Sequence, residues 1–526
     1  MLFFIFSWWL MAKSFGYDVR LHQFRVARHE VGDFGLHISL IRSFSWGKNY
    51  LNPQSPFFPG KGLLYHYRVD MLTGFLEKVG VRIDIAYNGI SAIAFAILLF
   101  LLYLFPQRLF GKSVLLGMLS VLLFIFPSTL SFIEFFRTRP ISFLLFHDLW
   151  YLPDYIHKGP FDGSLISIYF TLAPYLNQRH LIVGLALALG ILYRLVPRLL
   201  QHERLSVKEL LLTGFVLGLS SRVHGLIFFG TVVILVFLFT WLKRLKELSI
   251  LLVSVLIFSG FHMIQIIGER PELVRNAWFN PGFLSPRPLS LVGFTSYWGW
   301  NLGIAILLLP IAVYIVRSGQ RLFFFSFLAL FILANIFQFS FRIEHNHSLI
   351  NYFLVLSNFY LARLLVLLWA HNTYWKLTTA MTVFLLIASG ILNLMAVKND
   401  FQWYVFDASS QPFIQWIKTQ TDPDSIFLAH QELYDPVTMA GRKNYLGHSY
   451  YTSVMGYNTS VREKNIALFS QANDAVILGK MRQEKIDYIA VSTDPGQGLF
   501  SLGSKTVLEN TLSVVYRDAH VIVYKL

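Results

Sequence analysis

The chain has 526 residues, of which 55% are hydrophobic, 17% aromatic and only 14% charged, and its mean hydropathy is +0.54. A soluble domain has about a quarter charged residues, so this composition excludes an ordinary soluble protein and indicates a polytopic membrane protein. The formal net charge of +15 is no evidence for nucleic-acid binding, because much of it falls in short loops between apolar stretches. There is no cysteine, which excludes disulfides and thiolate metal sites.

About eleven apolar segments are predicted to cross the membrane as helices, because a helix needs roughly 20 apolar residues to span the hydrocarbon core. Three of them, 2–11, 180–195 and 210–221, are shorter than this. The first of the three lacks the small-residue cleavage site of a signal peptide, so we interpret it as a clipped first span. The others are 85–105, 114–133, 225–242, 249–267, 297–316, 322–339, 349–369 and 377–397.

Lysine and arginine predict the orientation of these helices, since short basic loops stay on the cytoplasmic side. The short basic connections lie around residues 108–112, 194–208, 243–246, 317–321 and 376. The alternate connections are longer and contain acids, histidines and aromatic residues; they are 13–84, 134–165, 268–296 and 341–348. We therefore expect the alternate set on the outer face of a multi-pass protein of the plasma membrane.

The composition changes after residue 397, where the long apolar runs end. The rest predicts a small α/β domain, which lies outside if the number of spans is odd. Its expected helices are 413–421 and 475–485, its strands 425–429 and 487–491, and its terminal hairpin 513–516 with 521–524. The predicted fold class is thus a polytopic α-helical membrane domain (1–397, with a large first outer loop at 13–84) followed by an extracytoplasmic α/β domain (398–526).

The first outer loop contains the acid on which the functional argument depends, Asp33. If a helix starts there, His37 falls one turn later on the same face, where the two could share a metal or a substrate. Two alternatives remain open. Asp33 is a favoured N-cap residue, and the segment 34–45 has the pattern of an amphipathic interfacial helix.

Turn residues at 52–60 lead to a dense polar-aromatic cluster, Tyr65-His66-Tyr67. Tyrosine and histidine at a membrane surface usually serve as interfacial anchors. They could instead form a platform for a sugar ring or hydrogen-bond a phosphate, and the local sequence does not decide between these roles.

Three basic sets lie at the outer ends of predicted spans. Arginine forks match phosphate oxygens, and a helix start nearby adds a favourable dipole, so together they predict a pocket for an anionic head group. For any single set, the alternative is that a long basic side chain near the end of a span extends its charged group to the membrane surface without binding a ligand. The candidate binding residues in these sets are Arg179, His180, Arg222, His224, Arg342, Glu344 and His345.

A divalent cation such as Mg²⁺ or Mn²⁺ would need oxygen ligands. The candidate ligands are Asp33, Asp148 and Asp154, the last two from the second outer loop. No spacing in that loop is diagnostic of a metal site, and a solvated acidic loop is the alternative.

Taken together, the chain resembles the GT-C superfamily of integral-membrane glycosyltransferases, which includes oligosaccharyltransferases, protein O-mannosyltransferases and lipid A aminoarabinose transferases. The resemblance lies in Gly32-Asp33, the proline-rich approach to Tyr65-His66-Tyr67, the many-span core and the outer α/β domain. The second outer loop lacks a paired-acid Asp-x-Asp, and this departure from the family's pattern leaves metal dependence open.

The resemblance implies transfer of a sugar from a polyprenyl phosphate or diphosphate to an acceptor on the outer face. Asp33 would accept the proton of an acceptor hydroxyl, or orient that acceptor. The charge on the leaving lipid phosphate would be stabilised by Arg179, Arg222, His224 or Arg342. The implied partners are a lipid-linked donor, membrane lipids and a glycan, lipid or protein acceptor, with no nucleic acid.

Three other interpretations remain open: a transporter or flippase, a polymerase or ligase of surface polysaccharides, and a membrane scaffold. Against transport, the charged residues gather at span ends rather than at mid-span. A polar-aromatic patch at 434–451 could bind a glycan, or be an ordinary packed loop.

Overall fold

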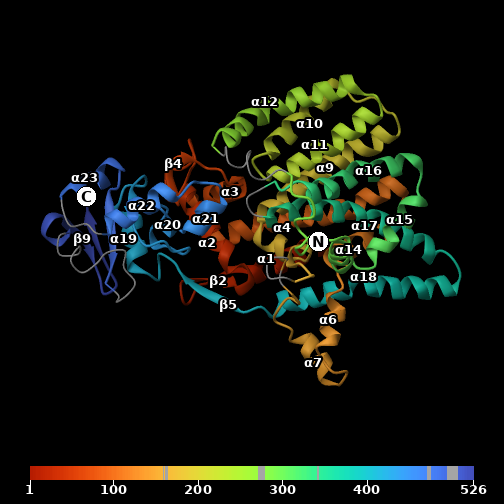
Figure 1. Ribbon diagram of the computed structural model, residues 1–526, viewed down its shortest axis with the longest axis horizontal. Helices are drawn as coiled ribbons and strands as arrows, with labels where there is room; N and C mark the ends of the chain where they lie inside the picture. Colours follow the sequence, from red (N-terminus) through yellow and green to blue (C-terminus); the bar gives the residue numbers. More distant parts are fainter. Residues whose placement is uncertain (158, 160–163, 270–278, 340–342, 471–474, 494–507) are drawn as a thin grey trace. The chain divides into compact units, whose positions relative to one another are not determined.

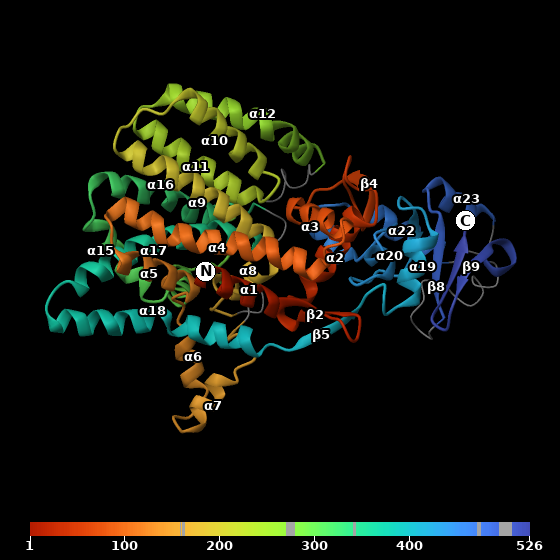
Figure 2. The same cartoon turned by 180° about the vertical axis from the view of Figure 1, so that it is seen from behind.

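The computed structural model describes residues 1–526 except 158, 160–163, 270–278, 340–342, 471–474 and 494–507 (Figures 1 and 2). These residues form two compact units, one of 1–14 with 91–401 and one of 15–90 with 402–526. The change of composition predicts a boundary at residue 397, with 13–84 in the membrane domain. The structure instead groups almost all of that first loop with the carboxyl-terminal segment.

The first unit, which we call the membrane unit, is helical (Figure 1). Helix α17 (His347–Trp369) is its centre, because it packs against α5, α11, α15, α16 and α18. The other helices are α1 (Leu2–Ser14), α4 (Ile83–Phe110, whose first residues belong to the other unit), α5 (Val114–Ile125), α6 (Ser131–Arg137), α7 (Leu144–Trp150), α8 (Ala173–Asn177), α9 (Arg179–Leu200), α10 (Val207–Ser220), α11 (Gly225–Trp241), α12 (Leu245–Glu269), α14 (Leu291–Leu302), α15 (Ala305–Tyr314), α16 (Ser318–Ile336) and α18 (Thr373–Asn399).

Glycine decides how closely α10 and α12 approach each other; both views show them side by side (Figures 1 and 2). A Cβ atom on Gly218 would lie 2.8 Å from the Cβ of Phe258, and one on Gly214 would collide with Ser254. Small residues at such positions let two membrane helices pack backbone against backbone.

Six helices of the described residues are long and apolar enough to cross a membrane, or seven if α14 and α15, which are bent by 81°, count as one span. The chain is therefore a multi-pass membrane protein, as predicted. Every predicted span falls on a helix or on this bent pair, but the number of crossings stays a prediction. The helix expected at 114–133 ends at Ile125, because Phe126 precedes a proline and leaves the helical conformation.

The second unit, which we call the α/β unit, contains two main sheets. The first is antiparallel, in the order β1–β2–β5, and it joins distant segments: β5 (Gln402–Phe406) pairs with β2 (Gln23–Ala27), with Gln23 opposite Phe406 and Ala27 opposite Gln402. This pairing explains why the first loop and the carboxyl-terminal segment belong to one unit. The remaining elements here are β1 (Phe15–Asp18), the small β3–β4 pair (Gln54–Ser55 and Phe58–Gly62), α2 (Val31–Ser45) and α3 (Arg68–Lys78).

The second sheet has the order β7–β6–β8–β10–β9 and confirms the strands predicted in the carboxyl-terminal segment. The terminal hairpin is β9 (Ser513–Arg517) with β10 (Val521–Lys525), and β6 (Ile426–Leu428) runs parallel to β8 (Tyr488–Ser492). The other elements are β7 (Lys443–Asn444), α19 (Pro412–Gln420), α20 (Pro436–Met439), α21 (Ser449–Val454), α22 (Ser460–Phe469) and α23 (Ala475–Gln483).

A buried ion cluster fixes α2 within the α/β unit. Arg42, 2% exposed, lies with its Nε 2.9 Å from Glu77 of α3 and an Nη 3.0 Å from Asp407, which follows β5. The guanidinium also stacks on the ring of Trp46, 3.3 Å from its centroid. Burial raises the pKa of Glu77, while the charge of Arg42 opposes this rise. The cluster therefore ties α2, α3 and the end of β5 together.

Candidate active site

Asp33 lies in the first turn of α2. The helix begins at Val31, and its N-cap residue is Glu30, whose side chain makes no capping hydrogen bond. The alternative that Asp33 is the N-cap is therefore wrong. A carboxylate in the first turn is favoured by the helix dipole, and it projects from the element that Arg42 holds in place.

Three tyrosines surround Asp33, and two of them come from the carboxyl-terminal segment. The Tyr451 hydroxyl donates a hydrogen bond to Asp33 Oδ1 at 3.5 Å, and the Tyr434 hydroxyl donates to the Val31 carbonyl oxygen at 2.5 Å. Burial raises the pKa of Tyr65 well above its ordinary value, and the charge of Asp33 raises it further. Burial and Asp33 also raise the pKa of Tyr434. Tyr65 and Tyr434 are therefore held as neutral O–H groups near the carboxylate.

His37 is paired with Asp70, which no sequence pattern marks as a site residue. Its Nδ1 lies 3.0 and 3.2 Å from the two carboxylate oxygens of Asp70 on α3, and both side chains are 1% exposed. Burial raises the pKa of Asp70, and His37 opposes the rise. The pair joins α2 to α3, and the His37 ring lies 6.0 Å from that of Tyr65. The Nδ1 of His37 is therefore engaged by the protein.

The other two residues of the Tyr65-His66-Tyr67 cluster differ in position: His66 lies beside Tyr65, whereas Tyr67 lies in the core of the α/β unit. The His66 ring is half-buried and lies 5.6 Å from Tyr65. Tyr67 is 8% exposed, precedes α3 and stacks on Phe44 at 5.9 Å. Its position predicts packing within the α/β unit rather than contact with a substrate.

Arg179 is fully buried in the membrane unit and is surrounded by protein acceptors. It donates to the carbonyl oxygens of Leu176 at 2.8 Å and Met11 at 3.2 Å, and to Ser14 Oγ at 2.6 Å; it also contacts the sulfur of Met11. These contacts tie the end of α1 to the start of α9. The geometry therefore gives Arg179 a structural role, in place of the phosphate-binding role predicted from sequence.

This role predicts the outcome of replacing Arg179 by methionine. Several buried acceptors would lose their donor, and each such loss costs about 1–3 kcal/mol of unfolding free energy. We expect a lower melting temperature of the purified protein in detergent. An unchanged melting temperature, together with weaker binding of a lipid phosphate, would show that Arg179 binds the phosphate and has no structural role.

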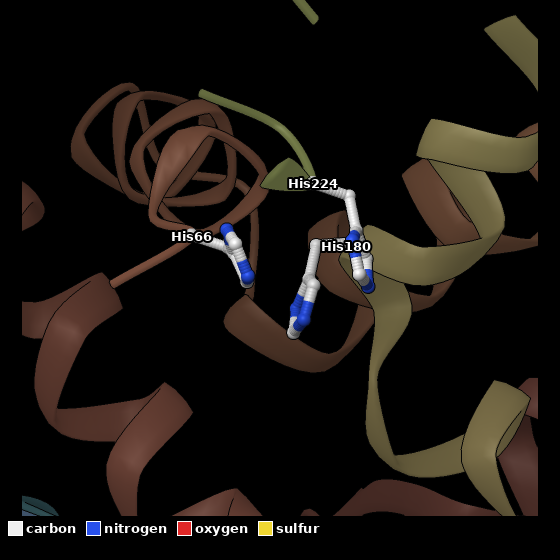
Figure 3. A group of neighbouring side chains, drawn as sticks. All are labelled: His66, His180 and His224. Carbon is white, nitrogen blue, oxygen red and sulfur yellow. The ribbon is translucent and has the colours of Figure 1, made fainter. Parts of the chain in front are cut away.

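Two histidines of the membrane unit lie together at helix starts. The rings of His180, the second residue of α9, and His224, the N-cap of α11, are 5.3 Å apart (Figure 3). The Oγ of Ser348, near the start of α17, lies 3.4 Å from His224 Nε2. Arg222 is half-buried two residues before His224. Three helix starts thus share a polar cluster, a combination that suits an anion. His66, also drawn in Figure 3, belongs to the α/β unit.

The third predicted basic set, which contains Arg342, Glu344 and His345, is only partly described by the structure. Arg342 and the side chain of Glu344 lie outside the described residues, and His345 is half-buried.

No protein-family model and no curated protein sequence matches the chain. Among solved structures, it is similar to the oligosaccharyltransferase of Archaeoglobus fulgidus in its apo form, a GT-C enzyme. The similarity has a TM-score of 0.50 at 12% identity and covers 93% of this chain and 69% of that chain. The chain has the GT-C fold.

Two further solved GT-C structures are similar to it. One is the same oligosaccharyltransferase tethered to an acceptor peptide containing the NVT sequon (TM-score 0.47, 11% identity, 93% of this chain and 68% of that chain). The other is ArnT from Cupriavidus metallidurans bound to undecaprenyl phosphate (TM-score 0.48, 13% identity, 100% and 97%). The similarity to the apo oligosaccharyltransferase confirms, at the level of the fold, the GT-C resemblance predicted from Gly32-Asp33 and its loop.

The predicted oxygen ligands belong to different units, Asp33 to the α/β unit and Asp148 and Asp154 to the membrane unit. In the part of the chain that the structure describes, no carboxylate belongs to a group of three close ligand side chains. Asp148 is 43% exposed and lies near His147 and Arg139, at 3.7 and 3.9 Å, and Asp154 is half-buried. A dedicated oxygen-ligand site for Mg²⁺ or Mn²⁺ needs more carboxylates than Asp33 alone.

Proposed function

We propose that the protein is a membrane glycosyltransferase that moves a sugar from a polyprenyl phosphate or diphosphate to an acceptor on the extracytoplasmic face. The observation that carries the proposal is Asp33, a carboxylate in the first turn of α2 that accepts a hydrogen bond from the Tyr451 phenol, in a chain with the GT-C fold. An acid at this place suits proton transfer, and phenols suit the hydroxyls of a sugar or acceptor.

In the proposed reaction, the acceptor oxygen attacks the anomeric carbon and forms the new glycosidic bond. The bond between that carbon and the phosphate oxygen breaks, and the lipid phosphate leaves with the electron pair. Asp33 takes the proton that the acceptor hydroxyl loses, so charge and atoms balance.

The leaving phosphate needs positive charge or oriented donors, which lower the energy of the developing anion. We propose that Arg222, His180 and His224 supply these, since they gather where α9 and α11 begin. We do not include Arg179 among the phosphate-binding residues, because its guanidinium already donates hydrogen bonds to Leu176, Met11 and Ser14.

The test is transfer of labelled sugar from a synthetic polyprenyl-phosphate sugar to added acceptors by the purified protein in detergent, with and without a chelator. Appearance of labelled product supports the proposal, and the chelator arm reports metal dependence. Movement of the donor across liposomes with no transfer to any acceptor would identify a flippase instead. Neither transfer nor movement would favour a scaffold.

A further inference from the structure

Tyr451 reaches Asp33 from a position 418 residues further along the chain. It lies on α21, a short helix of the carboxyl-terminal segment, and both residues belong to the α/β unit. Its ring lies 5.3 Å from that of His448, which precedes α21. The contact with Asp33 is therefore made by folding and not by local sequence.

The backbone of α2 is shaped to receive this hydroxyl. A Cβ atom on Gly32 would lie only 2.6 Å from the Tyr451 hydroxyl oxygen, closer than real Cβ contacts come. Glycine at this position therefore lets the phenol reach over the first turn of the helix to its neighbour, Asp33. The phenol and the glycine form a matched pair around one carboxylate.

We propose that Tyr451 is a positioning residue, which holds the Asp33 carboxylate by a hydrogen bond in the orientation that accepts the acceptor's proton. This inference rests on the function proposed above. Because the phenol comes from the carboxyl-terminal segment, the Asp33 carboxylate is correctly oriented only when that segment is folded against α2.

The other titratable groups around Asp33 leave Tyr451 with a distinct role. Tyr434 donates to the backbone at Val31, and His37 is paired with Asp70. Tyr65 is held in its neutral form by burial and by the nearby carboxylates. The hydrogen bond from Tyr451 lowers the proton affinity of Asp33, since a donor stabilises the charged form of a carboxylate.

Two independent substitutions test the proposal. Tyr451→Phe removes the hydroxyl, whereas Gly32→Ala keeps it and pushes it away from Asp33. Matched controls are Tyr404→Phe, a half-exposed tyrosine of β5, and Gly479→Ala, where an added Cβ would meet no atom within 4 Å. The measurements are kcat and KM for the lipid-linked donor, the pH profile of kcat, and the melting temperature of each variant.

We expect each test variant to lower kcat roughly tenfold, the low end for a hydrogen bond to a charged group, with KM unchanged. The acidic limb of the pH profile should move to higher pH, because Asp33 then holds its proton more tightly. The double variant should be no slower than the slower single, since both remove one interaction. Both controls should match the wild type.

Wild-type kcat and pH profile in both test variants, with Asp33→Asn inactive, would overturn this inference and leave the proposed function standing. A lower melting temperature with an unmoved pH profile would also overturn it, in favour of packing alone. If Tyr451→Phe fails to fold, Gly32→Ala decides the question. A wild-type protein without transfer would overturn both proposals.

Discussion

Asp33→Asn is expected to abolish sugar transfer, with a loss of at least about 10²–10⁴-fold in kcat, the usual contribution of a positioned acid–base group. Asparagine keeps the shape of the side chain and one oxygen that can accept the Tyr451 hydrogen bond. It cannot take the proton of an acceptor hydroxyl. The variant should therefore insert, fold and bind lipid phosphate normally, yet turn over no labelled donor.

The matched control is Asp424→Asn, an aspartate of the same unit whose side chain is 54% exposed and pairs with Lys443. It should retain full activity and the wild-type melting temperature. Full activity of Asp33→Asn would reduce Asp33 to a helix-dipole partner and remove the central residue from the proposed mechanism.

Arg42→Met is expected to cost the α/β unit about 3–5 kcal/mol of unfolding free energy. It leaves Glu77 and Asp407 in the interior without their cation, and removal of one member of a buried ion cluster is strongly destabilising. The ring of Trp46 also loses its stacked guanidinium. The measurement is denaturant or thermal unfolding, followed by tryptophan fluorescence.

The loss caused by Arg42→Met should depend on pH with a defined sign. Burial raises the pKa of Glu77 in the folded protein, so this group favours folding at low pH and loses that contribution as pH rises through its folded pKa. Without Arg42 the pKa rises further, so the variant should be closest to the wild type in mild acid and least stable above neutrality. Equal losses at all pH values would show that the carboxylates are not the cause.

Arg517→Met provides the contrast. The pair of Arg517 with Glu509 belongs to the same unit, but the two side chains are 54% and 45% exposed. An exposed pair contributes about 0–1 kcal/mol, so this variant should unfold almost like the wild type.

The helices of the membrane unit could be predicted from sequence because apolar length is a local signal. Where the prediction missed, a local cause is visible: α5 stops before a proline, and α14 and α15 break at Gly303. Gly303 has φ +58°, and a Cβ there would collide with the carbonyl oxygen of Ser128. The strands of the carboxyl-terminal segment were predicted for the same reason, from short apolar runs bounded by turns.

The site was predicted only in part, since its geometry depends on contacts between distant segments. The loop makes Asp33 a candidate and the sequence shows the patch at 434–451, but no local pattern links Tyr451 to Asp33 or Asp70 to His37. The same limit explains Arg179. Its position at a span end suggests a phosphate ligand, whereas its acceptors on α1 emerge only in the fold.

The pairing of β2 with β5 has a consequence for biosynthesis. Roughly 300 residues of the membrane unit separate the two halves of the α/β unit. At about 5–20 residues per second, the amino-terminal half waits on the order of tens of seconds for its partner strand to leave the ribosome. During that time β2 has an unpaired edge, and Arg42 and Glu77 lack Asp407. The period in which only the amino-terminal half has been made is therefore the stage of synthesis most exposed to mispairing and to proteolysis.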